Sequence, residues 1–230
     1  MEGTEVRKLT ELEDRHWWYR ERRTLLARAV AGLTPGDALD VGAAGGGNTR
    51  VLRERGWRAA ALEYGPEGAQ VCHERGIPVL RGDATRLPLA PSSVDLVVAF
   101  DVLEHLEDDK AAAGCVFDVL RPGGTFLVAV PCDMRLWSAH DVAVGHVRRY
   151  TRPELVDLLE AAGFAVDDVR SWMVLLRPAV ALKRRTSSGS DLDDPPTWLN
   201  RALRGVVALE RYLPLGGLPG VSLLVRARRP

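Results

Sequence analysis

The sequence lacks a long apolar run, an excess of either charge and any regular spacing of cysteines. No stretch approaches the roughly 18 apolar residues of a membrane-spanning helix, and the nearest, 173–182, is interrupted by Arg177 and Pro178. Basic and acidic residues number 31 each, so the formal net charge is zero and the electrostatic footprint of a nucleic-acid-binding protein is missing. We therefore expect no transmembrane segment and no nucleic-acid partner.

Cysteine is sparse as well. Cys72, Cys115 and Cys132 are odd in number and widely separated, which predicts neither a disulfide framework nor a zinc site. The first residues show no basic-then-apolar pattern of a secretory leader. We expect a soluble protein in the reducing cytoplasm, without a bound metal ion.

The stretch Ala38–Asn48 organises the rest of the chain. A short apolar run ends at Asp40-Val41, breaks into alanines and glycines, and resumes as helical sequence from Thr49, which predicts a strand, a tight turn and a helix. Small residues let the backbone approach a ligand, and the acid at the end of the strand suits a ligand that carries an amino group. Taken alone, the turn also fits a dinucleotide fold or a turn that binds nothing.

Strands and helices alternate regularly beyond that stretch. The strand-like runs occupy 37–42, 58–63, 77–81, 94–100, 125–130, 164–172 and 221–225. Such alternation favours a parallel sheet, in which the carboxyl ends of the strands share one edge. Four acids follow strands and should meet there: Asp40, Glu63, Asp83 and Asp101.

The two ends of this core carry extra segments. We predict one helix over 11–31, in which Trp17, Trp18 and Tyr19 cannot all face one core because neighbouring helical residues point about 100° apart. These rings either pack the helix onto the core or cover a ligand. Near the other end we predict a helix over 173–184, a flexible linker over 186–196 and a helix over 197–213.

These motifs, in this order, resemble those of a class I S-adenosylmethionine-dependent methyltransferase of the small-molecule type. The resemblance covers about residues 36–170, and its four motifs are matched by 40–47, Glu63, 82–84 and 94–106. It implies a doubly wound, Rossmann-like α/β fold. The seven-stranded sheet would be mostly parallel with an antiparallel last strand, and helices would cover both faces. The sequence departs from the family at Ala44, which stands where the family usually has a glycine. Its methyl group crowds the donor or restricts the backbone angles available to the turn.

The resemblance also implies three parts. Residues 1–35 would form a helical cap, 36–172 with 214–230 the core that binds S-adenosylmethionine, and 173–213 a helical insertion or acceptor-site lid. The implied donor contacts are Asp40, Gly42, Ala43, Gly45 and Gly46 for the methionine portion, Glu63 with Tyr64 for the ribose, Asp83 and Ala84 for the adenine, and Asp101 with Val102 beside the donor. S-adenosylhomocysteine would be the product.

The loop 132–150, after the fifth strand, carries the candidate catalytic groups. His140 beside Asp141 is the first candidate base, because a neighbouring acid raises the basicity of a histidine, and His146 is the second. A histidine that only bonds its own loop is the alternative. Five residues are candidate acceptor contacts: Trp18, Tyr19, His105, Trp137 and Tyr150.

The implied reaction is in-line methyl transfer to an oxygen or nitrogen atom of a small acceptor, such as a secondary metabolite (a natural product) or sugar derivative. In such reactions, alignment of the reactants and exclusion of water lower the activation barrier by about 7–11 kcal/mol. Three alternatives stay open: a nicotinamide-dependent oxidoreductase, a non-catalytic protein that binds S-adenosylmethionine, and a methyltransferase that reaches a lipid-linked acceptor at a membrane surface through 173–213. The sequence indicates no oligomeric state.

Overall fold

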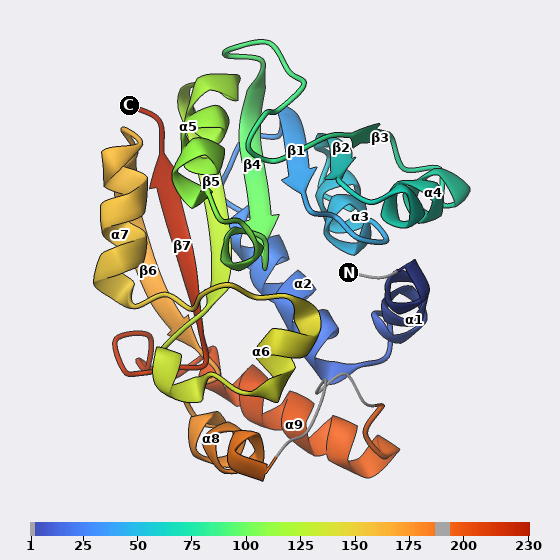
Figure 1. Ribbon diagram of the computed structural model, residues 1–230, viewed down its shortest axis with the longest axis vertical. Helices are drawn as coiled ribbons and strands as arrows, with labels where there is room; N and C mark the ends of the chain where they lie inside the picture. Colours follow the sequence, from blue (N-terminus) through green and yellow to red (C-terminus); the bar gives the residue numbers. More distant parts are fainter. Residues whose placement is uncertain (1–2, 187–193) are drawn as a thin grey trace.

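The computed structural model describes residues 3–186 and 194–230 and is built on a seven-stranded sheet (Figure 1). The strands are β1 (Asp37–Val41), β2 (Arg58–Glu63), β3 (Val79–Arg81), β4 (Val94–Phe100), β5 (Leu120–Pro131), β6 (Ala165–Trp172) and β7 (Ser222–Arg228). Their order is β3-β2-β1-β4-β5-β7-β6. The first five are parallel, and β7 runs antiparallel between β5 and β6. The predicted fold is confirmed.

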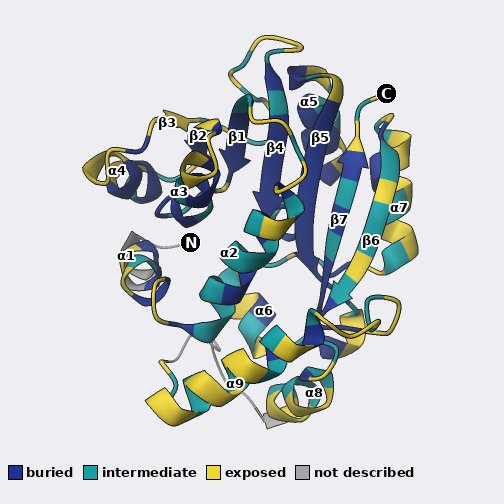
Figure 2. Ribbon diagram, turned by 180° about the vertical axis from the view of Figure 1, so that it is seen from behind, coloured by how far each residue is buried: buried dark blue, intermediate teal, exposed yellow. Residues whose placement is uncertain are grey.

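Helices cover both faces of the sheet. On one face α5 (Asp109–Val119) and α7 (Arg152–Ala161) pack against β1, β4 and β5. On the other, α2 (Trp17–Ala29) and α3 (Gly47–Glu54) enclose a second core, while α4 (Pro66–Glu74) packs on β2 and β3. Because both faces are covered, β4 is an almost continuous apolar run, as expected for a central parallel strand. Figure 2 shows this buried centre in dark blue.

The N-terminal segment differs from its prediction. The single helix expected over 11–31 is wrong: the chain forms α1 (Gly3–Leu12), turns, and restarts as α2. The break lies at His16, whose backbone is extended and whose Nδ1 accepts the Trp18 N–H at 3.3 Å. A side chain that caps a new helix competes with continuation of the old one, so the turn separates two helices.

The C-terminal segments also shift. The helix expected over 173–184 begins later, as α8 (Arg177–Thr186), since Pro178 is tolerated in a first turn and Met173 adopts a positive φ of 60°. Residues 187–193 of the expected linker lie outside the described residues. The last predicted helix is α9 (Thr197–Glu210).

The connection after β5 is partly helical, with η2 (Met134–Leu136) and α6 (Ala139–Val144), and β4 is followed by η1 (Leu103–His105). In Figure 1, α1, α6, α8 and α9 gather beyond the carboxyl ends of β1 and β4. None of the helices within 3–186 and 194–230 combines the length and apolar character needed to cross a bilayer. The division into cap, core and insertion stays a prediction.

The proposed cap shares its core with the sheet, because Leu26 of α2 is fully buried beside α3 and β4. We expect Leu26→Ala to lower the free energy of unfolding by about 2–5 kcal/mol, the usual loss for a buried leucine. Chemical denaturation would measure it, with Leu182→Ala on the exposed side of α8 as control. A change below about 0.5 kcal/mol would show that α2 is dispensable to the core.

Candidate functional site

A cavity of about 690 Å³ opens beyond the carboxyl ends of β1 and β4. That volume lies within the usual range of small-molecule sites. Its wall includes residues from the turn after β1, from α2, from the end of β4, from the histidine-bearing connections and from α8 and α9: Gly42, Ala43, Gly45, Trp18, Tyr19, Phe100, Asp101, His105, His140, His146, Leu176, Val180, Leu199 and Leu203. The cavity therefore joins the predicted donor turn to the predicted acceptor side.

The turn after β1 adopts the conformation that its small residues allow. Gly42 and Gly46 have positive φ angles of 66° and 79°. A Cβ atom on Gly42 would stand 2.7 Å from Cγ2 of Val102, so this position lacks both the room and the backbone angle for a larger residue. Ala44 also has a positive φ, of 50°, which a non-glycine residue adopts at some energetic cost.

Asp40 lies beneath that turn and is completely buried. Its Oδ2 accepts a hydrogen bond from the Thr49 hydroxyl at 2.7 Å, whereas its Oδ1 is buried without a hydrogen-bond partner among the described residues. Burial raises the pKa of Asp40 to about 7. An orphaned acceptor at the base of a glycine turn fits a donor that brings an amino group, as the methionine portion of S-adenosylmethionine does.

The residues predicted to hold the adenosine portion lie outside the cavity wall. Glu63 accepts a hydrogen bond from the Ala44 N–H, and burial raises its pKa to about 7. Asp83 is exposed and accepts hydrogen bonds from the Thr85 N–H and hydroxyl, each at 2.8 Å, which lower its pKa. Tyr64 is 77% exposed, and Ala84 packs at the margin of the core. Their donor contacts stay predictions.

Asp101, at the end of β4, pairs with an arginine that the sequence analysis left unassigned. Arg22 of α2 forms an ion pair with Asp101, and its guanidinium stands 4.6 Å from the Trp18 ring centre and 4.9 Å from that of Phe100. Both distances suit cation–π contacts. Burial and the charge of Asp101 together raise the pKa of the Tyr19 hydroxyl. The basic residues that follow the aromatic run 17–19 were the sequence signal that could have indicated this pair.

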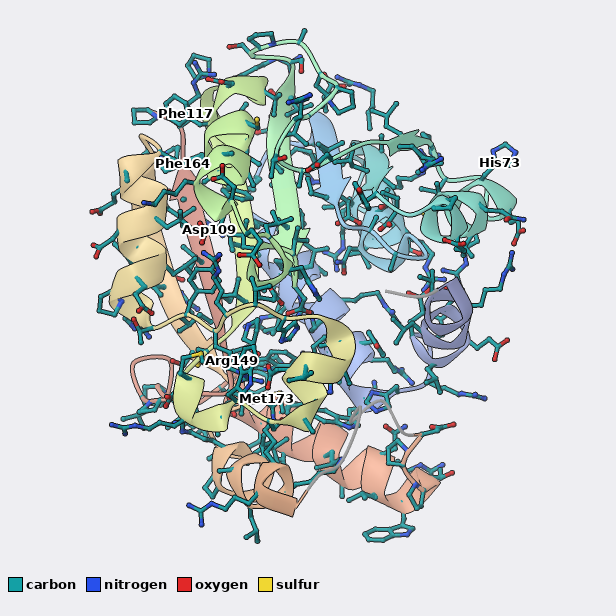
Figure 3. All side chains as sticks on the ribbon, viewed as in Figure 1. His73, Asp109, Phe117, Arg149, Phe164 and Met173 are labelled. Atoms are coloured by element: carbon teal, nitrogen blue, oxygen red, sulfur yellow. The ribbon has the colours of Figure 1, made fainter. Side chains whose placement is uncertain are left out.

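Asp141, which the sequence analysis paired with His140, contacts His146 in the structure. His146 Nδ1 lies 2.8 Å from Asp141 Oδ1, and Asp141 also pairs with Arg149 at 2.8 Å. The Asp141 carboxylate also closes the capping box of α6 with Ser138. His140 still lines the cavity, with its ring centre 6.2 Å from that of His146. In Figure 3 Arg149 lies beside the α6 connection.

Two candidate acceptor contacts do not line the cavity. The Tyr150 hydroxyl is buried and donates to Asp109 at 2.8 Å, and Asp109 is labelled at the start of α5 in Figure 3. Trp137 is half-buried at the end of η2. Trp18, Tyr19 and His105 do line it. The hydrogen bond between Tyr150 and Asp109 joins segments far apart in the chain, so no local sequence pattern predicted it.

Together, the strand order, the glycine turn after β1 and the acids at the ends of β1, β2 and β4 define a nucleoside-binding α/β protein of Rossmann-like design. Residues 14–169 match the family model described as "Methyltransferase domain". The chain belongs to this family of S-adenosylmethionine-dependent methyltransferases, for which S-adenosylmethionine is the methyl donor.

Two relatives illustrate the range of the family. A Mycolicibacterium smegmatis (strain ATCC 700084 / mc(2)155) protein named "Probable S-adenosylmethionine-dependent methyltransferase" is 33% identical over 171 residues, which cover 72% of this chain and 66% of that protein. The ubiquinone biosynthesis O-methyltransferase of Idiomarina loihiensis (strain ATCC BAA-735 / DSM 15497 / L2-TR) is 26% identical over 182 residues, 70% of this chain and 73% of the relative. The chain thus spans slightly less than two thirds of the first relative's length.

Solved structures share the fold. A methyltransferase in complex with the Haloferax volcanii Trm112 methyltransferase activator matches 99% of this chain and 95% of its own, with a TM-score of 0.68 and 23% identity. The [4+2]-cyclase SpnF matches 91% of this chain and 80% of its own, with a TM-score of 0.61 and 20% identity. Since the second is named for a different reaction, the fold by itself does not define the chemistry.

The buried Asp40 generates a prediction with a definite sign. Its pKa of about 7 exceeds the ordinary aspartate value of 3.8, so between about pH 4 and 7 the folded protein binds more protons than the unfolded chain and loses stability as the pH rises. We expect Asp40→Asn to remove this loss, so that its stability relative to the wild type rises by about 3–4 kcal/mol between pH 4 and 7.5, while affinity for S-adenosylmethionine falls.

Denaturation at several pH values would measure the first effect and calorimetry the second. Asp37→Asn is the matched control, because ion pairs with Arg58 and Arg121 lower the pKa of Asp37 and give the opposite pH dependence. A stability difference that does not change with pH would contradict the assignment.

Proposed function

We propose that this protein transfers the methyl group of S-adenosylmethionine to an oxygen or nitrogen atom of a small-molecule acceptor held in the cavity. The observation that carries this proposal is the continuity of the cavity, which reaches from the glycine turn at Gly42 to the histidines 105, 140 and 146. A donor seated at the turn and an acceptor at the histidines would share one enclosed space. In-line transfer depends above all on such alignment and on exclusion of water.

The residues that line the cavity indicate the kind of acceptor that it would bind. Trp18 and Phe100 supply aromatic surface, and Leu176, Val180 and Leu203 of the C-terminal segments supply aliphatic surface. Charged side chains line it as well, from α2, from the end of β4 and from α8. The apolar part of the wall favours an acceptor with an apolar body, as in many secondary metabolites, and the polar part would contact its hydroxyl or amine groups.

His146 is the base that the geometry favours. By accepting from Nδ1, the Asp141 carboxylate holds the imidazole in the tautomer whose Nε2 carries the lone pair. His146 lines the cavity, so this lone pair would take the proton of the acceptor hydroxyl as the methyl group transfers. Positioned bases of this kind contribute about 10²–10⁴-fold. His140, on the same wall, is the lesser candidate.

A second candidate is methylation of a lipid-linked acceptor at a membrane surface. Trp198 and Leu209 of α9 are 71% and 56% exposed and lie three helical turns apart, hence on one side of the helix. The exposed Arg201 and Arg204 lie on the same helix. Because Leu199 and Leu203 of α9 line the cavity, a bilayer at this surface would meet the mouth of the site.

The base assignment predicts a separation of turnover from donor binding. With trideuteromethyl-labelled donor and a metabolite extract as the source of acceptors, we expect His146→Gln to lower the rate of label transfer about 10²–10⁴-fold. The dissociation constant of S-adenosylmethionine should change less than twofold. His73→Gln, on α4 away from the cavity, is the matched control.

Mass spectrometry of the products and calorimetry of the donor give the two readouts. An equal loss of turnover and donor affinity would rule out a dedicated base. Donor binding without any labelled product would instead support a non-catalytic protein that binds S-adenosylmethionine.

The membrane candidate predicts co-flotation with vesicles that contain anionic lipid. We expect the wild type to float and the double variant Trp198→Ser, Leu209→Ser to stay at the bottom of the gradient, since each exposed apolar side chain adds to burial in the interface. Tyr64→Ser removes another exposed ring, in the connection between β2 and α4, and should float like the wild type. If the wild type does not float, the membrane candidate is contradicted and methylation of a soluble small molecule is the proposal that stands.

A further inference from the structure

Glu104 is a buried acid without a hydrogen bond. It is completely inaccessible, and neither carboxylate oxygen has a hydrogen-bond partner among the described residues. Its closest ion-pair contact is at 3.8 Å, from Oε1 to His146 Nε2. A buried carboxylate without a hydrogen-bond partner is costly.

Among the described residues, no arginine forms an ion pair with Glu104. Arg22 pairs with Asp101, and Arg149 and Arg184 both pair with Asp141. A bound cation would supply the contact that the Glu104 carboxylate lacks.

Two histidines lie beside Glu104, and Nε2 of one of them, His146, is 3.8 Å from Glu104 Oε1. His105 Nδ1 lies 3.2 Å from the Gly145 carbonyl oxygen, and His146 Nδ1 lies 2.8 Å from Asp141. When each Nδ1–H donates to these oxygens, the Nε2 lone pair is available. A carbonyl or carboxylate on the far nitrogen is the usual outer support of a metal-bound histidine. The two rings are 4.8 Å apart, edge to face.

One ligand atom from each of Glu104, His105 and His146 lies within 4.8 Å of the others. Bonds of about 2.1 Å to one ion bring ligand atoms to roughly 3 Å from one another. Small side-chain rotations would close the difference. We propose that these three residues bind one divalent transition-metal ion at the wall of the acceptor cavity, with coordination positions open toward it.

The donor set defines the class of ion. Two imidazoles and one carboxylate suit zinc, iron, cobalt or nickel better than calcium or magnesium, which prefer oxygen ligands. No metal was expected from the three scattered cysteines. This cluster is not apparent in the sequence, since only Glu104 and His105 are adjacent while His146 comes from the connection after β5. The Val147 N–H, which donates to the Glu104 carbonyl at 2.8 Å, joins that connection to the end of β4.

The role of this ion rests on the proposed methyl transfer. A coordinated acceptor hydroxyl is a stronger acid, so it loses its proton to solvent before transfer. The oxygen lone pair then forms the O–CH₃ bond while the S–CH₃ electron pair returns to sulfur, giving neutral S-adenosylhomocysteine. Proton and ion compete for the same lone pair of His146, so the base described above belongs to the metal-free protein.

The test is titration of chelator-stripped full-length protein with Co²⁺, followed by visible absorption and by metal analysis after gel filtration. We expect one Co²⁺ per chain, with affinity at least tenfold weaker in both Glu104→Gln and His105→Gln. His73→Gln, which changes an exposed histidine on α4, should bind like the wild type. If circular dichroism shows one cluster variant to be unfolded, the other decides.

No saturable Co²⁺ binding by the wild type, or equal affinity in all variants, would overturn the proposal. Titration of the same samples with S-adenosylmethionine separates the two proposals. Donor binding without cobalt binding removes the metal site and leaves the methyl transfer standing, whereas cobalt binding without donor binding does the reverse.

Discussion

The ion pair between Arg22 and Asp101 is the contact on which the site depends. It joins α2, from the N-terminal segment, to the end of the central strand β4, and the Arg22 side chain is 6% exposed. The rings of Trp18 and Phe100 flank the guanidinium and hold it over the strand ends. The pair helps to hold α2 against the strand ends, where Trp18 and Tyr19 of this helix line the cavity.

The site also retains buried acids that stability alone would not favour. Asp40 and Glu63 both have pKa values raised to about 7 by burial, and Glu104 has neither oxygen hydrogen-bonded among the described residues. We proposed the donor for Asp40 and Glu63 and a metal ion for Glu104 as the groups that would complete these contacts. Proteins commonly concentrate such perturbed groups at functional sites, and here they follow the strand ends from β1 to β4.

Much of this design was readable from the sequence, and the rest depended on distant contacts. The strands from 37 to 130 were predictable because each apolar run ends at a turn residue, and parallel strands must share an edge. The helix break at His16 and the contact between Asp141 and His146 were not predictable. Each depends on a side-chain hydrogen bond that competes with the local sequence pattern. Glu104 received no role from the sequence, because its burial depends on segments that the fold brings together.

The central claim is that the acid-tipped edge of this sheet binds S-adenosylmethionine in the cavity closed by α2. Calorimetric titration of the purified protein tests it most directly. The account predicts saturable binding of S-adenosylmethionine and S-adenosylhomocysteine at one site per chain, and no heat from NADH. A flat trace with both sulfur nucleosides together with saturation by NADH would contradict it.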